Sequence, residues 1–197
     1  CVAAIRAVSD LVGRDCTPDD IARWSTEAEI AADSTMFDLQ PVAFRQRYGC
    51  ALRTLGLAFP PMRVIAVDPG GSAVDTIARA TPSYTHAELA GFQDLLALLE
   101  DSIGRQDARG VARVATASAA IHQRYYPHHR WNEIVTIARR GGALGVACAH
   151  SGSVISVLLT PEEERSGEAR IVTELKALDV DILARYTLSS GPGGGAI

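Results

Sequence analysis

The sequence predicts an α+β fold. Segments with helical periodicity surround a few short, β-branched runs that are expected to pair as antiparallel strands. The chain has 197 residues, which is enough for one domain of ordinary size or two small ones. Its composition, 47% hydrophobic and 21% charged, is that of a globular protein with a proper core.

Charge, hydropathy and cysteine usage narrow the range of partners. The net charge is −4, and the sequence has no cluster of basic residues that could neutralise the phosphates of a nucleic acid. Nucleic acid is therefore not expected as a partner. No apolar run reaches membrane-spanning length and no signal peptide is visible, so we expect a cytoplasmic protein without membrane contact. The cysteines at positions 1, 16, 50 and 148 show no CxxC pair and no metal-ligand spacing against the histidines. They are expected to be reduced thiols that are buried or half-buried, and no metal site is predicted.

The first third of the chain predicts two helices and a hairpin. Residues 1–13, CVAAIRAVSDLVG, have helical periodicity but no N-cap before them, which suggests the C-terminal part of a longer protein. The second helix is expected to begin at Pro18, after Thr17 as N-cap, and to run to about Ile30. PVAFRQRYG and CALRTLG, joined at Gly49, predict a short hairpin, and the FPP that follows predicts a boundary.

The rest of the chain alternates strands and helices. MRVIAVDPGG is the clearest strand. Three helices are predicted between Thr85 and Arg139, with Thr85 and Asp107 as caps and Gly104 and Pro127 as breaks: THAELAGFQDLLALLEDSIG, DARGVARVATASAAIHQRYY, which ends at Tyr126, and HHRWNEIVTIARR, which begins at His128. GALGVACAHSGSVISVLL predicts two strands around a turn, TPEEERSGEARIVTELKAL a helix, and DILARYTL a last strand. The final SSGPGGGAI has almost nothing to bury and is expected to be disordered.

The turn His150-Ser151-Gly152-Ser153 is the first candidate for chemistry. A plain hairpin would favour Asn-Gly or Asp-Gly at its corner. Small residues and hydroxyls around a glycine instead allow backbone N–H groups to approach an anion closely. Both interpretations stay open: a tight hairpin with no further role, or a loop shaped for a ligand.

Other candidates are acidic residues and histidines. Asp33, in ADSTMF, either caps the next element or takes a proton from a substrate hydroxyl. Asp68, before Pro-Gly-Gly, is expected to serve a turn. His128 and His129 are interpreted as a solvated helix start, and His122 has no partner that the sequence can name.

Four segments in this order resemble the GHMP kinase superfamily, which includes homoserine, mevalonate and galactose kinases. They are VAAIRAVSDLVG, ADSTMF, VIAVDPGGSAVDTIAR and GALGVACAHSGSVISVLL. The chain is most similar to the branch of L-threonine kinases of cobalamin biosynthesis and propanediol utilisation. The resemblance implies the C-terminal part of a two-domain GHMP kinase fold, with a ferredoxin-like α/β sandwich as main domain. Residues 1–59 would be the remnant of the ATP-binding domain, 60–189 the ferredoxin-like domain, and 190–197 the disordered tail.

The resemblance also implies roles for particular residues. Asp33 matches the aspartate near the reacting hydroxyl, and Ser34 would hold the substrate beside it. His150, Ser151, Gly152 and Ser153 match the superfamily's third conserved motif, a glycine-containing loop that is called the third-motif loop below. His150 and Ser151 would bind the substrate, while Gly152 and Ser153 would lie near the phosphate. The branch usually approaches this aspartate through a Glu-Pro-Thr-like sequence, but here it reads Ile-Ala-Ala, which leaves the acceptor substrate open.

The expected activity is transfer of the γ-phosphate of ATP, with Mg²⁺, to the side-chain hydroxyl of a small amino acid such as L-threonine. The family's phosphate loop and the serine ligand of Mg²⁺ would precede residue 1, so this chain alone is expected to be inactive. An exposed apolar patch on residues 1–59 and self-association through it are also expected. Two alternatives remain: a kinase for homoserine or another small alcohol, and a non-catalytic small-molecule-binding or assembly module.

Overall fold

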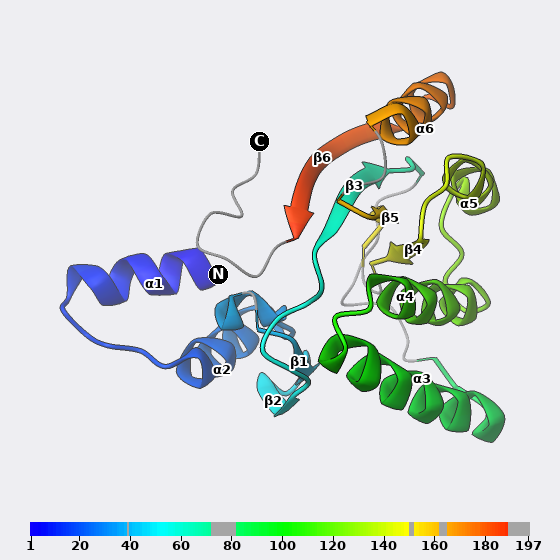
Figure 1. Ribbon diagram of the computed structural model, residues 1–197. Helices are drawn as coiled ribbons and strands as arrows, with labels where there is room; N and C mark the ends of the chain where they lie inside the picture. Colours follow the sequence, from blue (N-terminus) through cyan, green and yellow to red (C-terminus); the bar gives the residue numbers. More distant parts are fainter. Residues whose placement is uncertain (39, 72–81, 150–151, 162–164, 189–197) are drawn as a thin grey trace. The chain divides into compact units, whose positions relative to one another are not determined.

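The computed structural model describes residues 1–38, 40–71, 82–149, 152–161 and 165–188, and the observations below concern those residues (Figure 1). They form two compact units, Cys1–Phe59 and Pro60–Ile197, which are described separately. The predicted glycine-rich tail lies outside the described residues. Within them, no helix combines the length and the apolar character that crossing a membrane would require.

Unit 1 contains the predicted helices and hairpin. Thr17 caps the second helix, and its hydroxyl and the carboxylate of Asp20 satisfy each other's backbone N–H groups in a capping box. The two strands pair antiparallel, which confirms the hairpin. A small core joins the second helix to the 3-10 helix through Ile21, Ala22, Ala32 and Met36. The elements are α1 (Val2–Leu11), α2 (Pro18–Glu29), the 3-10 helix η1 (Ser34–Phe37), β1 (Val42–Arg45) and β2 (Cys50–Thr54).

Helix α1 buries little of its apolar surface. Val2 and Ile5 pack on the unit 1 core, but Val8, Leu11 and Val12 are 59%, 85% and 64% exposed. These three side chains follow one another at helical spacing along one side of α1. The expectation of exposed apolar surface within residues 1–59 is therefore met, while self-association stays a prediction.

Unit 2 contains the predicted strands and helices, with two shifted boundaries. The middle helix ends at Gln123, not at Tyr126, and the next begins at Trp131, not at His128. Thr85 and Asp107 cap their helices as predicted, each accepting a hydrogen bond from a backbone N–H of the first turn. The elements are β3 (Met62–Asp68), α3 (His86–Gly104), α4 (Ala108–Gln123), α5 (Trp131–Arg140), β4 (Gly145–Cys148), β5 (Ile155–Leu159), α6 (Arg165–Ala177) and β6 (Asp181–Leu188).

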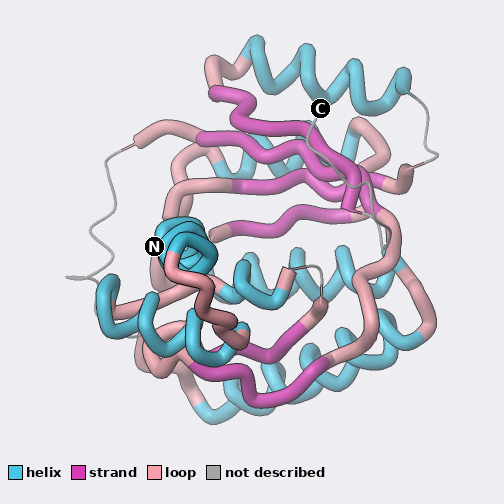
Figure 2. Tube along the Cα trace, turned by 90° about the vertical axis from the view of Figure 1, so that its left-hand side faces the viewer, coloured by secondary structure: helices cyan, strands magenta, loops and turns pink. Residues whose placement is uncertain are grey.

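The strands of unit 2 form one antiparallel sheet in the order β4-β5-β3-β6. With helices between β3 and β4 and between β5 and β6, this is the ferredoxin-like arrangement that the resemblance implied. Helices α5 and α6 cover one face of the sheet, and α4, backed by α3, lies on the other (Figure 2). The main core fills the space under α5 and α6 and includes Ile65, Val67, Ile134, Ile155, Val157, Ile171 and Leu175, all fully buried.

Helix α4 also blocks the open edge of the sheet. β4 is an edge strand, and its Val146 donates its backbone N–H to Oγ1 of Thr116 at 2.9 Å. The same hydroxyl lies 3.3 Å from the carbonyl oxygen of Val146. A side chain at Gly145 would come within 2.4 Å of Thr116 Oγ1 and 2.6 Å of the Ala112 carbonyl. The glycine therefore permits this close approach, and the edge is not left open to another strand.

Candidate functional site

Asp33 occupies the N-cap position of η1, but its side chain makes no capping hydrogen bond. Its Oδ1 instead accepts a hydrogen bond of 3.2 Å from Nε2 of Gln46, which lies in the turn between β1 and β2. The Asp33 side chain is exposed and Ser34 is half-buried. The interpretation of Asp33 as a capping carboxylate is therefore wrong. Its side chain accepts a hydrogen bond from the hairpin turn and none from the backbone N–H groups of η1.

The turn that holds Asp33 is itself fixed to helix α2. The carbonyl of Gln46 accepts from the backbone N–H of Ala32 at 3.0 Å and from Thr26 Oγ1 at 3.4 Å. Gly49 ends the turn with φ +59°, and a Cβ there would lie 2.6 Å from Thr26 Oγ1 and 2.7 Å from the Ala22 carbonyl. Only glycine allows the hairpin to approach α2 this closely. The segment before Asp33 is thus held from two sides.

The third-motif loop lies at the end of the β4–β5 hairpin. Ala149 donates its backbone N–H to the carbonyl of Val154 at 2.8 Å, which extends the pairing of the hairpin beyond the ends of β4 and β5. Gly152 and Ser153 are half-buried, and His150 and Ser151 lie outside the described residues. A side chain at Gly152 would meet only the Cβ of Ala149, at an ordinary 3.6 Å. Packing within the described residues therefore does not require a glycine at this position.

The turn after β3 lies at the same end of the sheet as this loop. Val67 pairs with Ile155, so β3 ends where β5 begins. Asp68 Oδ1 accepts the backbone N–H of Gly70 at 3.0 Å, which confirms its predicted role in the turn. Gly71 lies against His129, since a Cβ at Gly71 would be 3.4 Å from the Cβ of His129. The third-motif loop, the Asp-Pro-Gly-Gly turn and the exposed His129 therefore lie at the same end of the sheet.

The predicted solvated start of helix α5 is wrong for His128. This residue is half-buried, and its backbone N–H donates to Oε1 of Gln123 at 2.6 Å. Its Nδ1 lies 3.0 Å from Nε2 of the same amide. Gln123 therefore holds His128 against the end of α4, and the helix begins three residues later at Trp131. His129, next in sequence, is exposed as predicted.

His122 belongs to a buried cluster of side chains that the sequence did not reveal. Only 3% of its surface is exposed, and its ring centroid lies 5.4 Å from that of Tyr126 and 5.7 Å from that of His128. Gln123 also reaches Cys148 Sγ at 3.7 Å. Ligand atoms of His122, His128 and Cys148 lie within 4.8 Å of one another, although helix α5 separates the helix of the first from the strand of the last along the chain. No spacing rule could have found this cluster.

Cys148 is not placed to act as a nucleophile. Burial raises the pKa of its thiol to about 11, against a smaller lowering by the hydrogen bond from Gln123. A thiol with this pKa is almost entirely protonated at neutral pH, and the thiolate is the reactive form. All four cysteines are free thiols, and the expectation of buried or half-buried thiols is confirmed for Cys16, Cys50 and Cys148 but is wrong for Cys1, which is exposed.

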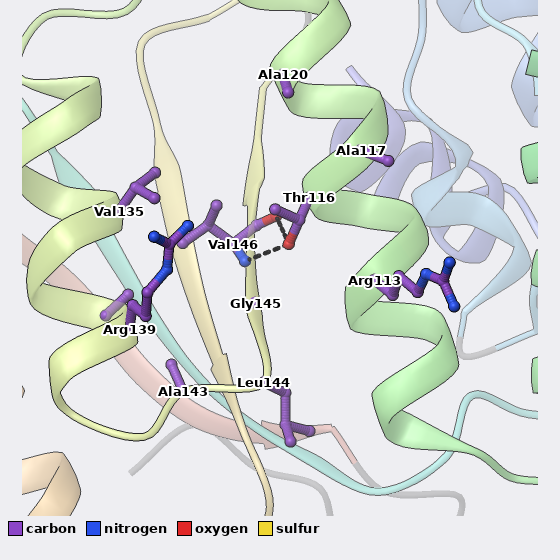
Figure 3. A pocket seen from close by; sticks show the side chains of 11 residues that line it. Arg113, Thr116, Ala117, Ala120, Val135, Arg139, Ala143, Leu144, Gly145 and Val146 are labelled. Carbon is purple, nitrogen blue, oxygen red and sulfur yellow. Dashed lines mark hydrogen bonds between the residues drawn. The ribbon is translucent and has the colours of Figure 1, made fainter. Parts of the chain in front are cut away.

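A cavity of about 500 Å³ lies along the outer edge of β4, between α4 and α5. Figure 3 shows that Arg139 extends from α5 over it, whereas the side chain of Arg113 points away from it. Its walls are otherwise small or apolar, and the Thr116 hydroxyl in the wall is engaged by Val146. The lining residues are Arg113, Thr116, Ala117, Ala120, Val135, Ala138, Arg139, Ala143, Leu144, Gly145 and Val146.

The sequence-predicted site residues fall in both units. Asp33 and Ser34 belong to unit 1, and Gly152 and Ser153 to unit 2. The candidate metal ligands that gather in threes among the described residues do not suit Mg²⁺. The group that they form is two imidazoles and a thiol, whereas Mg²⁺ prefers hard oxygen ligands in octahedral geometry.

Neither protein-family models nor curated proteins match this chain, but solved structures do. A homoserine kinase from Cytophaga hutchinsonii has a TM-score of 0.69, with 14% identity over 100% of this chain and 65% of its own. L. major mevalonate kinase, in complex with R-mevalonate, has a TM-score of 0.64, with 16% identity over 98% and 64%. Streptococcus pneumoniae phosphomevalonate kinase, in complex with phosphomevalonate and AMPPNP, has a TM-score of 0.64, with 8% identity over 94% and 66%.

These likenesses show the fold. They confirm the predicted α+β class and the C-terminal part of the GHMP kinase fold. The chain spans 65% and 64% of the lengths of the homoserine and mevalonate kinases, that is, slightly less than two thirds of each.

Proposed function

We propose that this chain is part of an ATP-dependent small-molecule kinase of the GHMP type. The observation that carries the proposal is the fold likeness to solved kinases along the whole chain, with a TM-score of 0.69. In this interpretation residues 1–59 belong to the ATP-binding domain and residues 60–189 form the ferredoxin-like domain. The protein would act in the cytoplasm.

We assign to Asp33 the role of accepting the proton of the acceptor's hydroxyl group. The hydroxyl oxygen bonds to the γ-phosphorus of ATP, the bond to the β–γ bridging oxygen breaks, and ADP leaves. The hydroxyl proton passes to the Asp33 carboxylate. Phosphoryl transfer depends mainly on positioning, and the Gln46 hydrogen bond positions this carboxylate while leaving it exposed to a substrate. Ser34, next in the chain, would bind the same substrate.

We assign the third-motif loop to binding of the phosphate. Since the described neighbours of Gly152 would tolerate a side chain, close approach of a ligand explains the glycine better than internal packing does. Ser153 would donate to the ligand together with backbone N–H groups of the loop, and His150 and Ser151 would line the acceptor side. ATP enters this scheme as a substrate. Mg²⁺, which GHMP kinases are expected to need, is assigned no ligand in this chain.

The acceptor is proposed to be L-threonine, in cobalamin-related metabolism, on the strength of the sequence resemblance. The fold likeness to a homoserine kinase favours L-homoserine as the second candidate. Both amino acids present a primary or secondary hydroxyl to the same carboxylate. A small-molecule-binding or assembly module without catalysis is the alternative of a different class.

The test is phosphoryl transfer from radiolabelled ATP, measured on the protein at its full encoded length. L-Threonine, L-homoserine and R-mevalonate serve as acceptors. Asp33→Asn is expected to lower kcat about 10²- to 10⁴-fold, because that is the usual contribution of a positioned acid or base. Asp38→Asn, five residues away on the same segment, is the matched control and is expected to stay within about twofold, since that carboxylate pairs with Arg6.

Transfer to none of the acceptors, or full activity in Asp33→Asn, would overturn the kinase proposal. In that case, binding of a small alcohol that survives Asp33→Ala would favour the non-catalytic module. Preference for L-homoserine over L-threonine would keep the kinase and change its acceptor.

A further inference from the structure

The cluster of His122, His128 and Cys148 lies outside the residues assigned to phosphoryl transfer. It draws its ligand atoms from three places in unit 2: the last turn of α4, the loop before α5, and the last residue of β4. All three atoms lie within 4.8 Å of one another. His122 is 3% exposed, and His128 and Cys148 are half-buried. Three metal-ligating side chains therefore converge in a site that is largely shielded from water.

The donor set has a definite chemical preference. Imidazole nitrogen and thiolate sulfur suit borderline and soft transition metals, and they do not suit Mg²⁺ or Ca²⁺. Two histidines with one cysteine make three protein ligands for a tetrahedral ion such as Zn²⁺, which leaves a fourth position for water or another ligand. Tetrahedral Zn²⁺ at ordinary bond lengths places such donor atoms about 3.4–3.6 Å apart. The three ligand atoms lie within 4.8 Å of one another and would have to approach by about 1 Å, which side-chain rotation allows.

Neighbouring polar groups already hold two of the three candidate ligand residues in place. Gln123 contacts two of the three ligand residues, through Nδ1 of His128 and Sγ of Cys148, and it accepts the backbone N–H of His128. The amide N–H of Gln123 donates to Cys148 Sγ, and a hydrogen bond to the sulfur favours the thiolate form that binds a metal. Two residues before Cys148, Val146 is held to α4 by Thr116. Helix α4 and strand β4 are thus tied together next to the point where their ligands meet.

We propose that His122, His128 and Cys148 bind one divalent transition-metal ion of the Zn²⁺ class inside unit 2. The ion would tie the end of α4 to the end of β4, two residues before the third-motif loop begins. Its role is independent of the identity of the phosphate acceptor. It requires neither ATP nor an active kinase, so failure of the proposed function would leave this inference standing.

The experiment titrates the metal-stripped chain with Co²⁺ and Zn²⁺ in the presence of a non-thiol reductant. Co²⁺ reports a cysteine ligand through the near-ultraviolet charge-transfer absorption of a cobalt–thiolate bond. Wild type is expected to bind one ion with this absorption, and Zn²⁺ is expected to displace Co²⁺ and raise Tm. Cys148→Ser and His128→Gln are each expected to weaken binding at least tenfold, and Cys148→Ser to abolish the thiolate absorption.

Two matched controls separate this site from adventitious binding. His129→Gln alters the exposed neighbour of His128, and Cys50→Ser alters another half-buried free thiol. Both are expected to bind metal like wild type. Because His122 is buried and its replacement risks misfolding, the wild-type Tm with and without Zn²⁺ provides the second measurement. Absence of thiolate absorption in wild type, an equal signal in Cys148→Ser, or a Tm that Zn²⁺ does not raise would overturn the proposal.

Discussion

Gln46 and Asp33 are joined by a hydrogen bond of 3.2 Å between the amide Nε2 and the carboxylate Oδ1. The two residues are 13 positions apart, one in a hairpin turn and the other at the start of a 3-10 helix. An amide N–H donates to a carboxylate without neutralising it. The bond therefore fixes the direction of one oxygen and leaves Asp33 able to accept a proton. In the proposed kinase, the hairpin is the device that orients the base.

Gln46→Ala is expected to lower kcat/KM for the acceptor about tenfold in the full-length kinase. The variant loses one orienting hydrogen bond to a charged group, and tenfold corresponds to about 1.4 kcal/mol. Stability should change little, because the Gln46 carbonyl still accepts from Ala32. Gln40→Ala, an exposed glutamine of the same segment, is the control and should leave kcat/KM unchanged. An unaltered kcat/KM in Gln46→Ala would show that the hydrogen bond does not position Asp33 for catalysis.

Gly49→Ala is expected to destabilise unit 1 by about 2–3 kcal/mol. A Cβ there would lie 2.6 Å from Thr26 Oγ1 and 2.7 Å from the Ala22 carbonyl, and the residue also has positive φ. Gly13→Ala isolates the backbone effect, because Gly13 has φ +64° but nothing within 4 Å. That control should cost only about 1 kcal/mol. Urea unfolding followed by circular dichroism measures both, and equal losses would mean that the close approach to α2 is unimportant.

Local signals in the sequence predicted most of the fold. Thr17 and Thr85 were predicted as N-caps because a capping residue acts on backbone groups two or three positions away. The capping boxes that they complete with Asp20 and Glu88 are equally local. Alternating and β-branched runs predicted every strand for the same reason. The start of α5 was misplaced because a side chain of the preceding helix, Gln123, takes the backbone N–H of His128.

The candidate sites could be predicted only in part. The sequence singled out Asp33 through its resemblance to a family, but not Gln46, whose role depends on a hairpin turn meeting a distant segment. The His122, His128 and Cys148 cluster shows the same limit more strongly. Its members come together only because α4 and β4 pack side by side, and spacing along the chain carries no trace of that packing.

Acid is expected to weaken unit 2 through Glu88. Its carboxylate accepts from Tyr125 Oη at 2.6 Å and from the N–H and hydroxyl of Thr85, and it pairs with Arg124. The Tyr125 hydrogen bond is the largest cause that lowers the pKa of Glu88 from 4.5 to about 2. As pH falls, the unfolded chain takes up the proton first. The stabilisation is therefore complete above about pH 4.5 and is lost between there and about pH 2.

Urea unfolding across this pH range measures the effect of Glu88. Glu88→Gln is expected to flatten the fall in the free energy of unfolding between about pH 4.5 and pH 2. Tyr125→Phe keeps the carboxylate but removes its strongest partner, so the pKa of Glu88 in the folded state should rise, and the loss of stability should be smaller and complete at a higher pH. An identical acid limb in wild type and Glu88→Gln would contradict the assignment.

Thr116→Val is expected to destabilise unit 2 by about 1–3 kcal/mol, because it removes the acceptor of a backbone N–H on the edge strand. Valine matches threonine in shape, so packing against Gly145 is kept. Thr136→Val is the matched control: Thr136 also donates to the carbonyl four residues earlier, but it is exposed on α5 and accepts nothing from the sheet. The control should change the free energy of unfolding by less than about 0.5 kcal/mol.

Amide hydrogen exchange gives the sharper measurement, since the Val146 N–H should lose protection in Thr116→Val alone. Retained protection there would show that the cover of helix α4, rather than the threonine hydroxyl, keeps the edge of β4 closed.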